Sequence, residues 1–185
     1  MNRFVKRICT LALAAGIAAA LAAPAHAEAL ITQGSSELGI GGGLDFKSAV
    51  GTDVSLGVRY AYFFWDQISL GGTVGVADND AATSFKVGGV GEYNFKLSEK
   101  YQPVIGTDFV PFVGFGLSYQ HVDIHHEKEN ALVFTTEAGL KFFLTDSAAI
   151  ITSGIFDLAT EDIFPDDDDA NKWNFALNLG MRFYF

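Results

Sequence analysis

The sequence predicts an all-β protein, an eight-stranded antiparallel up-and-down transmembrane β-barrel that is preceded by a cleaved signal peptide. Hydrophobic residues alternate with small or polar residues in eight segments, which is the period of a β-strand. The chain contains 20 Gly and 17 Phe among 185 residues, a mixture that disfavours helices and favours strands. The face opposite the hydrophobic one is small and mostly uncharged, whereas a water-soluble barrel would carry Lys, Glu and Asp there.

Residues 1–27 are typical of a secretory signal peptide. Arg3, Lys6 and Arg7 precede a run of thirteen Leu, Ala, Ile and Gly residues, and residues 25–27 have the A-x-A form of a cleavage site. Thirteen apolar residues are fewer than the roughly 20 that a membrane-spanning helix needs. We therefore expect a signal peptide over residues 1–27 and a barrel domain over residues 28–185.

Charge and cysteine content exclude several classes of protein. The chain has 22 acidic and 12 basic residues and a formal net charge of −10, and removal of the signal peptide makes it more acidic. This balance excludes a basic nucleic-acid binder. Cys9 is the only cysteine and leaves with the signal peptide, so disulfides and Cys-based metal sites or nucleophiles are excluded. We expect no nucleic-acid partner and no cofactor.

The first four strands are expected at residues 38–46, 54–62, 68–76 and 85–97. Their hydrophobic faces begin at Leu38, Val54, Ile68 and Phe85, and each continues at every second position. The glycines on these faces, and those between them, allow bending and close packing in a small barrel.

The last four strands are expected at residues 113–119, 132–144, 148–158 and 173–185. Three of them alternate clearly from Val113, Leu132 and Trp173. Between residues 148 and 158 either register is tolerable, and a β-bulge is one way to accommodate this. Strands of ~9–11 tilted residues joined by short connections are sufficient to cross a bilayer.

The connections fall into two sets. An even number of strands places both termini on one side, together with short connections at residues 63–67, 98–102 and 145–147. The other side carries residues 47–52, 77–84, 122–130 and 159–172, which are longer overall and strongly polar. Short periplasmic turns and longer outside loops are typical of bacterial outer-membrane barrels, although residues 47–52 are no longer than a turn.

Two further features favour a hydrophobic face in lipid and a polar face in the lumen. The interior of an eight-stranded barrel is narrow and requires small side chains. The inward positions meet this requirement with Ser55, Gly57 and Ala61 in one strand and with Asn174 and Ala176 in another. Aromatic residues fall near the strand ends, where they form girdles at the membrane interfaces: Tyr60, Tyr62, Phe64, Trp65, Tyr93, Phe95, Tyr119, Trp173 and Phe183. An ordinary β-sandwich core is the alternative, and it would still need a charged outer face.

Charged residues at inward positions predict an ion-pair network. These are Arg59, Lys86, Glu92, Glu137, Lys141 and Arg182. Unpaired charges in so narrow a lumen would be costly, so we expect the carboxylates to pair with the cations and fill the lumen. The network either holds the lumen shut or acts as a gate that rearranges to let ions pass.

Three segments resemble the outer-membrane β-barrel domain superfamily, which includes outer-membrane proteins A, W and X. The segments are residues 110–119, residues 138–145 and the end Asn178-Leu179-Gly180-Met181-Arg182-Phe183-Tyr184-Phe185. The resemblance implies an integral outer-membrane barrel exported through the periplasm, in contact with outer-membrane lipid and lipopolysaccharide. We expect the barrel to be a monomer.

The C-terminal strand carries the most specific part of this resemblance. Chains of this kind end in outward apolar residues and a terminal aromatic, which the barrel-assembly machinery recognises by strand pairing. Phe175, Met181, Phe183 and Phe185 match that signal. The resemblance therefore implies the secretion channel and the barrel-assembly machinery as partners during biogenesis.

Neither acidic nor histidine-rich segments predict a defined metal site. Asp166, Asp167, Asp168 and Asp169 are weak candidates, because the run lacks the Gly and terminal Glu of a calcium loop. Diffuse binding of calcium or magnesium between this loop and lipid phosphates fits the run better than a defined calcium cage, and a soluble acidic loop without bound ions is the favoured interpretation. His125-His126 with Glu127 and Glu129 has the right ligand types but no spacing that fixes them.

These observations rank three classes of function. We expect a structural and surface-interaction role with at most a narrow gated pore. Transport of small or hydrophobic molecules across the outer membrane is the alternative, and charges in the lumen count against it. A lipid-modifying enzyme is the least favoured class, since Ser118 and His121 point to opposite sides of one strand and no G-x-S-x-G motif occurs. We expect no catalytic residue.

Overall fold

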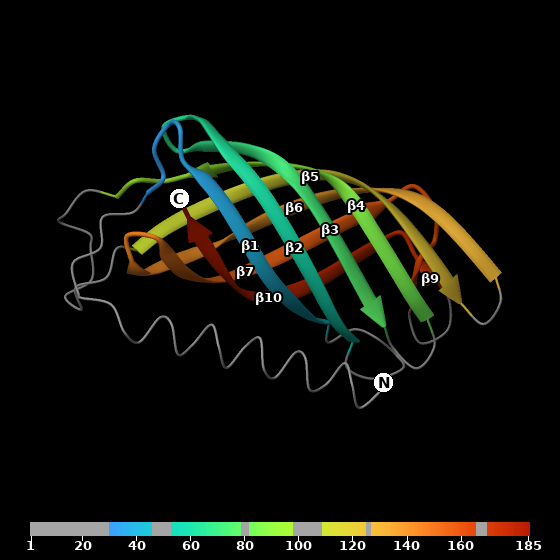
Figure 1. The fold of residues 1–185 in the computed structure, drawn as a ribbon. Helices are drawn as coiled ribbons and strands as arrows, with labels where there is room; N and C mark the ends of the chain where they lie inside the picture. Colours follow the sequence, from blue (N-terminus) through green and yellow to red (C-terminus); the bar gives the residue numbers. More distant parts are fainter. Residues whose placement is uncertain (1–29, 46–52, 79–81, 98–108, 125–126, 166–169) are drawn as a thin grey trace.

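The computed structural model describes residues 30–45, 53–78, 82–97, 109–124, 127–165 and 170–185. Within them, eight strands form a closed barrel of tilted strands (Figure 1). They are β1 (Ser36–Asp45), β2 (Asp53–Trp65), β3 (Ile68–Asp78), β4 (Ala82–Asn94), β5 (Phe109–Ile124), β6 (Glu127–Thr145), β7 (Ala148–Ala159) and β10 (Trp173–Tyr184). Two short strands, β8 (Phe164–Pro165) and β9 (Ala170–Asn171), pair only with each other. No helix in the described ranges is both long and apolar enough to span a membrane.

Each barrel strand pairs antiparallel with its neighbours, and β1 closes the barrel against β10. The closing ladder runs from Glu37 opposite Tyr184 to Leu44 opposite Leu177. Closure leaves no unpaired edge, which is how a β-structure satisfies its backbone in lipid. The predicted eight-stranded antiparallel barrel is confirmed. The predicted signal peptide, residues 1–27, lies outside the described residues.

The two ends of the barrel differ. At one end, called the turn end here, two-residue turns join β2 to β3 at Asp66 and Gln67 and join β6 to β7. The first and last strands also meet there, because Ser36 and Phe185 exchange backbone hydrogen bonds of 2.7 and 3.0 Å. The opposite end is called the loop end. The expected contrast in connection length is wrong: residues 95–108 join β4 to β5 at the turn end, where a short connection at residues 98–102 was predicted, whereas three residues separate β3 from β4 and two separate β5 from β6 at the loop end. Both ends of the described barrel sequence lie at the turn end, as predicted.

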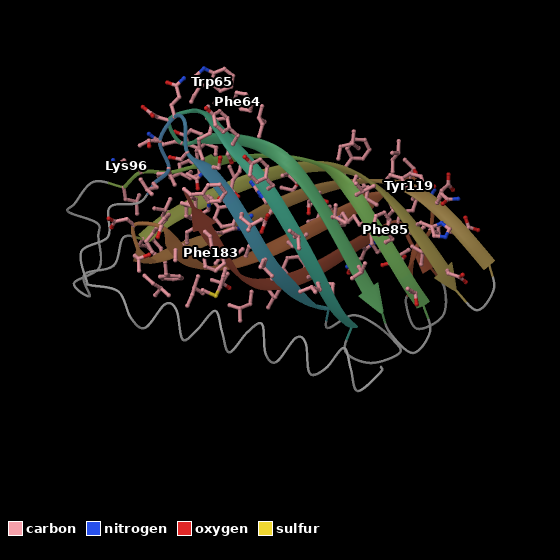
Figure 2. The ribbon with its side chains drawn as sticks, in the orientation of Figure 1. Phe64, Trp65, Phe85, Lys96, Tyr119 and Phe183 are labelled. Carbon is pink, nitrogen blue, oxygen red and sulfur yellow. The ribbon has the colours of Figure 1, made fainter. Side chains whose placement is uncertain are left out.

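Alternation along the strands separates a hydrophobic outer face from a small and polar inner face. Outward residues such as Phe115 and Leu179 remain 66% and 62% exposed, whereas the inward Arg59, Ser69 and Lys141 are buried. Side chains stand out all around the wall in Figure 2, with Phe64, Trp65, Phe85, Tyr119 and Phe183 among them. Large exposed apolar residues around the whole barrel are what a lipid-facing surface requires.

Aromatic pairs lie toward both ends of the outer face. Near the turn end, the rings of Tyr62 and Phe64 are 5.0 Å apart and those of Tyr93 and Phe95 are 4.8 Å apart, both edge to face. On the loop-end half, Phe156 stacks on Trp173 at 6.4 Å. Aromatic side chains concentrate at the two interfaces of a bilayer, so this distribution fits a membrane-spanning band between them.

The register of β7 was ambiguous in the sequence and is fixed in the structure. Ile151, Ser153 and Asp157 point into the lumen, while Phe156 and Leu158 face outward. The irregularity lies in β6 rather than β7, because the register with β7 shifts between Phe143 and Thr145. A bulge at a strand end adjusts pairing where the barrel turns.

The expected loop at residues 122–130 is mostly strand, which corrects the prediction. β5 continues to Ile124 and β6 begins at Glu127, and their ladder pairs Val122 with Glu129 and Asp123 with Lys128. The predicted strands at residues 113–119 and 132–144 ended where the outward residues become polar. Backbone pairing continues past that point because the ladder is formed by backbone groups and does not require an apolar outer face.

Candidate functional site

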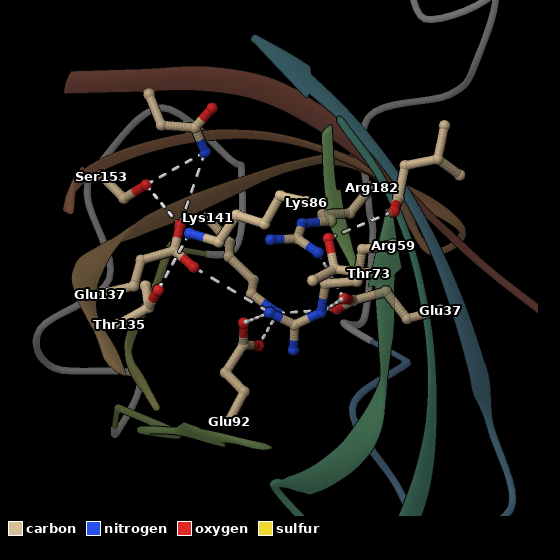
Figure 3. A network of polar contacts seen from close by, with 12 residues as sticks. Glu37, Arg59, Thr73, Lys86, Glu92, Thr135, Glu137, Lys141, Ser153 and Arg182 are labelled. Atoms are coloured by element: carbon tan, nitrogen blue, oxygen red, sulfur yellow. Dashed lines mark hydrogen bonds and ion pairs between the residues drawn. The ribbon is translucent and has the colours of Figure 1, made fainter. Parts of the chain in front are cut away.

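The lumen holds a buried ion-pair network centred on Glu37. Its side chain is fully buried and is approached by three cations (Figure 3). Arg59 Nε and Arg182 Nη1 lie 3.2 and 2.8 Å from Glu37 Oε1, and Lys141 Nζ lies 3.0 Å from Glu37 Oε2. One carboxylate on the first strand therefore holds cations from β2, β6 and β10.

A second buried carboxylate, Glu92 on β4, completes this layer. Arg59 Nη1 lies 3.1 Å from Glu92 Oε2, and Lys141 Nζ donates to Glu92 Oε1. Lys141 Nζ also donates to the Tyr184 hydroxyl at 3.0 Å. We call Glu37, Arg59, Glu92, Lys141 and Arg182 the charged layer. It ties together five of the eight barrel strands across the lumen.

The register of the strands explains why Arg182 reaches Glu37. Gly39 pairs with Arg182 on one side and with Arg59 on the other, so three inward positions lie in one row. A Cβ on Gly39 would lie 2.6 Å from Arg182 Nη1. The missing side chain therefore leaves the space that the guanidinium occupies.

Glu137 lies beside the charged layer on its loop-end side. It accepts a hydrogen bond of 2.6 Å from Ser153 Oγ and one of 3.5 Å from Asn178 Nδ2, and Arg59 Nη1 is 4.0 Å away. A separate pair lies farther along the lumen, where Lys86 Nζ is 3.1 Å from Asp157 Oδ1. Thr135 connects the two residues of this pair by accepting from Lys86 and donating to Asp157.

The structure brings together five of the six charged residues that the sequence suggested for the lumen network: Arg59, Glu92, Glu137, Lys141 and Arg182. The sixth, Lys86, pairs with Asp157 instead. Sequence reasoning missed the carboxylates of Glu37 and Asp157. Glu37 precedes Leu38, the first outward residue of the first strand. Because side chains alternate along a strand, Glu37 points inward. Asp157 was hidden by the ambiguous register of β7.

An apolar cluster closes the lumen on the turn-end side of the charged layer. Its buried members are Ile31, Phe63, Val110, Phe143, Ala149 and Tyr184. Ile31, only 2% exposed, comes from the segment before β1, which crosses this end. That segment is held by hydrogen bonds of 2.9 Å from Gly34 N to Phe63 O and from Gln67 N to Ile31 O. The lumen is thus blocked by an apolar layer beneath a charged one.

A cavity of about 310 Å³ occupies the lumen on the loop-end side of the charged layer. Arg59 and Arg182 border it on one side, and Lys86 and Asp157 lie along its wall. At the loop end, Ile163 packs in a buried cluster with Val122, Ala131, Val133 and Ala159, and Phe164 packs against this cluster. Both Ile163 and Phe164 line the cavity.

The candidates for other chemistry are not assembled in the described part of the chain. Ser118 is buried and donates to the Val133 carbonyl oxygen at 3.4 Å, whereas His121 Nδ1 lies 2.7 Å from Asn130 Oδ1 on the outer face. The described residues contain no group of three His, Cys, Asp or Glu side chains suited to a metal ion. Residues 125–126 and Asp166, Asp167, Asp168 and Asp169 lie outside the described residues.

The C-terminal residues of the expected assembly signal lie on the outer face of β10. Phe175 and Phe185 are 50% and 67% exposed, and Met181 and Phe183 share their face. The hydrophobic side chains of this strand therefore stand outside the lumen.

A closed eight-stranded barrel with a lipid-like exterior and a polar interior is the architecture of a known protein family. Residues 10–183 match the family model described as outer membrane protein beta-barrel domain. The chain belongs to this family. It is an integral protein of the bacterial outer membrane. No curated protein is significantly similar to it in sequence.

Solved structures show the same fold at low sequence identity. The N-terminal β-barrel domain of Pseudomonas aeruginosa OprF aligns with a TM-score of 0.62 at 19% identity, covering 83% of this outer-membrane barrel chain and 98% of the other. Neisserial surface protein A aligns with a TM-score of 0.58 at 13% identity, covering 82% and 96%. Pseudomonas aeruginosa OprG aligns with a TM-score of 0.51 at 12% identity, covering 86% and 99%.

Proposed function

We propose that this outer-membrane barrel is closed to ions in its resting state and has a structural and surface-interaction role. Any pore would be narrow and would open only if the charged layer rearranged. The observation that carries this proposal is the charged layer lying on the apolar cluster of Phe63, Phe143 and Tyr184. An ion moving along the lumen would have to break buried ion pairs and displace packed aromatic rings, and both steps are costly.

Single-channel recording in planar bilayers tests the closed state. We expect the folded wild-type barrel to give no reproducible openings. A variant with Glu92→Gln and Glu137→Gln weakens the lumen contacts, and one with Glu129→Gln and Glu161→Gln removes two exposed loop-end acids as a control. Reproducible wild-type openings that change in the lumen variant but not in the control would overturn the proposal and establish a pore.

The surface role is supported by the length of the β5–β6 hairpin. β5 has 16 residues and β6 has 19, whereas ~9–11 tilted residues suffice to cross a bilayer. Beyond the outward Tyr119, the outward positions become polar at His121 and Asn130. The Tyr119 hydroxyl and the His121 ring both contact the Asn130 side-chain oxygen. We infer that this hairpin extends past the lipid and presents a pre-formed surface outside the cell.

Cysteine labelling on intact cells tests this orientation. Glu129→Cys places a thiol on the exposed part of the hairpin, and Asp146→Cys places one on an exposed turn at the other end. We expect a membrane-impermeant maleimide to label Glu129→Cys and to leave Asp146→Cys unlabelled until the cells are broken. The unsubstituted chain measures background. Labelling of Asp146→Cys alone on intact cells would reverse the orientation.

We propose the partners that the resemblance implied: lipopolysaccharide and other outer-membrane lipid around the barrel, and the secretion channel and barrel-assembly machinery during biogenesis. A monomer is sufficient, because closure leaves no strand edge to be paired. The exposed aromatic side chain of Phe185 supports an assembly signal.

The assembly signal predicts a difference between folding in cells and folding in detergent. We expect Phe185→Ser to reduce the amount of heat-modifiable barrel in the outer membrane several-fold, while the purified variant folds in detergent like wild type. Phe115→Ser is the matched control, because Phe115 is a lipid-facing phenylalanine of similar exposure outside the assembly signal, and this variant should accumulate more than Phe185→Ser. Equal accumulation of Phe185→Ser and wild type would remove the role of this residue in assembly.

A further inference from the structure

The lumen cavity owes its space to glycines that the backbone does not require. On one wall, Gly41 pairs with Gly57, and Gly57 pairs with Gly75 across β1, β2 and β3. Elsewhere, as at Gly88, an added Cβ would collide with a neighbouring strand. At Gly57 and Gly75 it would meet backbone atoms no closer than 3.7 and 3.6 Å, which is ordinary contact. At these two positions the wall is bare backbone where side chains would fit, whereas a Cβ on Gly41 would lie 3.1 Å from Asn178 Oδ1.

The remaining walls combine an apolar surface with a few polar groups. Ile151 and Ile155 project from β7, and Ile163 lies at the loop end of the cavity. Lys86 and Thr135 supply hydrogen-bonding groups along the side. An apolar cavity with a small number of convergent polar groups, in the size range from about 300 Å³ upward, is typical of small-molecule sites.

The charges of the lumen are already balanced. The described lumen residues include four cations, Arg59, Lys86, Lys141 and Arg182, and four acids, Glu37, Glu92, Glu137 and Asp157; every cation has an ion-pair contact. A ligand with a net charge would therefore bring a charge without a counterion into a desolvated site. An uncharged ligand avoids that cost.

Lys86 provides an anchor for such a ligand. Its ammonium group has three N–H donors, of which Thr135 and Asp157 use two. Its side chain is 26% exposed, in contrast to the fully buried Lys141 in the charged layer. A hydroxyl or carbonyl oxygen in the cavity can thus accept a hydrogen bond from Lys86 without disturbing the ion pair.

We propose that this cavity, called the lumen pocket here, binds a small uncharged amphipathic molecule. The polar atom of the ligand lies at Lys86 and Thr135, and its apolar part packs against Ile151, Ile155 and Ile163. The charged layer forms the floor, so the ligand is held rather than passed through. The pocket does not depend on the surface role proposed above.

Methyl NMR of the barrel in lipid nanodiscs tests the pocket, with isotope-labelled isoleucine methyl groups and benzyl alcohol as the probe. We expect saturable shifts at the lumen methyls of Ile151, Ile155 and Ile163. The outward Ile68 and Ile150 report partitioning of the probe into lipid, and their shifts should rise without saturation. Benzoate, which has a similar ring and a negative charge, should bind at least roughly tenfold more weakly.

Filling the pocket provides the decisive variants. Gly57→Leu and Ala176→Leu each place a side chain into it from a different wall, and Gly72→Leu places the same side chain on the lipid face. We expect both filling variants to lose the saturable shifts and Gly72→Leu to keep them; if one filling variant does not fold, the other decides. Lumen methyls that never saturate in wild type, or that saturate equally in a folded filling variant, would overturn the proposal.

Discussion

Replacing Glu37 with Gln is expected to lower the free energy of unfolding of the barrel by ~3–5 kcal/mol, the range for breaking a buried ion pair. Glu37 is fully buried and contacts three cations. The substitution keeps the size of the side chain and removes its charge. Arg182 then loses the one ion-pair partner recorded for it among the described residues, and its charge is left in a desolvated lumen. Urea titration in lipid vesicles, followed by the fluorescence of Trp65 and Trp173, measures the change.

The matched control is Glu129→Gln, which removes the same charge from an exposed position on the β5–β6 hairpin and should change stability by no more than about 0.5 kcal/mol. A double-mutant cycle separates charge pairing from packing. With Arg182→Met as the second change, we expect a coupling energy of ~0.5–3 kcal/mol between the two sites. A change below about 1 kcal/mol in Glu37→Gln would show that the charged layer is not a major source of stability.

The sequence was sufficient to predict the fold because the bilayer imposes a strong pattern. A barrel wall in lipid must be apolar on one side at every second residue, so outward residues such as Leu56, Val74 and Leu177 mark the strands directly. Closure follows from the need to pair every strand edge. The same alternation placed Arg59, Lys141 and Arg182 at inward positions, so their side chains were predicted to meet in the lumen.

Other features depend on packing in three dimensions and carry no simple periodic signal. The β5–β6 ladder continues beyond the part of the hairpin whose outward face is apolar, so residues 122–130 resembled a loop. Ile163 lies outside every barrel strand and is nevertheless buried, because the connection after β7 folds back onto Val122 and Val133. The lumen cavity depends on which glycines face empty space, and the sequence does not distinguish Gly57 from Gly71.

The difference between glycines that face empty space and glycines that face backbone leads to a second prediction with a large effect on stability. Gly71 and Gly75 both lie on the inner face of β3, but their surroundings differ. A Cβ on Gly71 would overlap the Tyr60 carbonyl oxygen and lie 2.5 Å from the Ala61 Cα, both backbone atoms of the paired strand β2. Since backbone cannot move aside as a flexible side chain can, we expect Gly71→Ala to lower the free energy of unfolding by about 3 kcal/mol, the upper part of the range for overpacking.

Gly75→Ala is the control on the same strand, because its Cβ would lie 3.6 Å from the Leu56 carbonyl oxygen and border the lumen pocket. We expect a change within about 0.5 kcal/mol of wild type by the same urea titration. Equal losses in the two variants would mean that any side chain on this face of β3 is harmful, whatever its local contacts. Equal tolerance would mean that β2 and β3 move apart at Gly71 at little cost, and that glycine is not needed there to keep the two strands close.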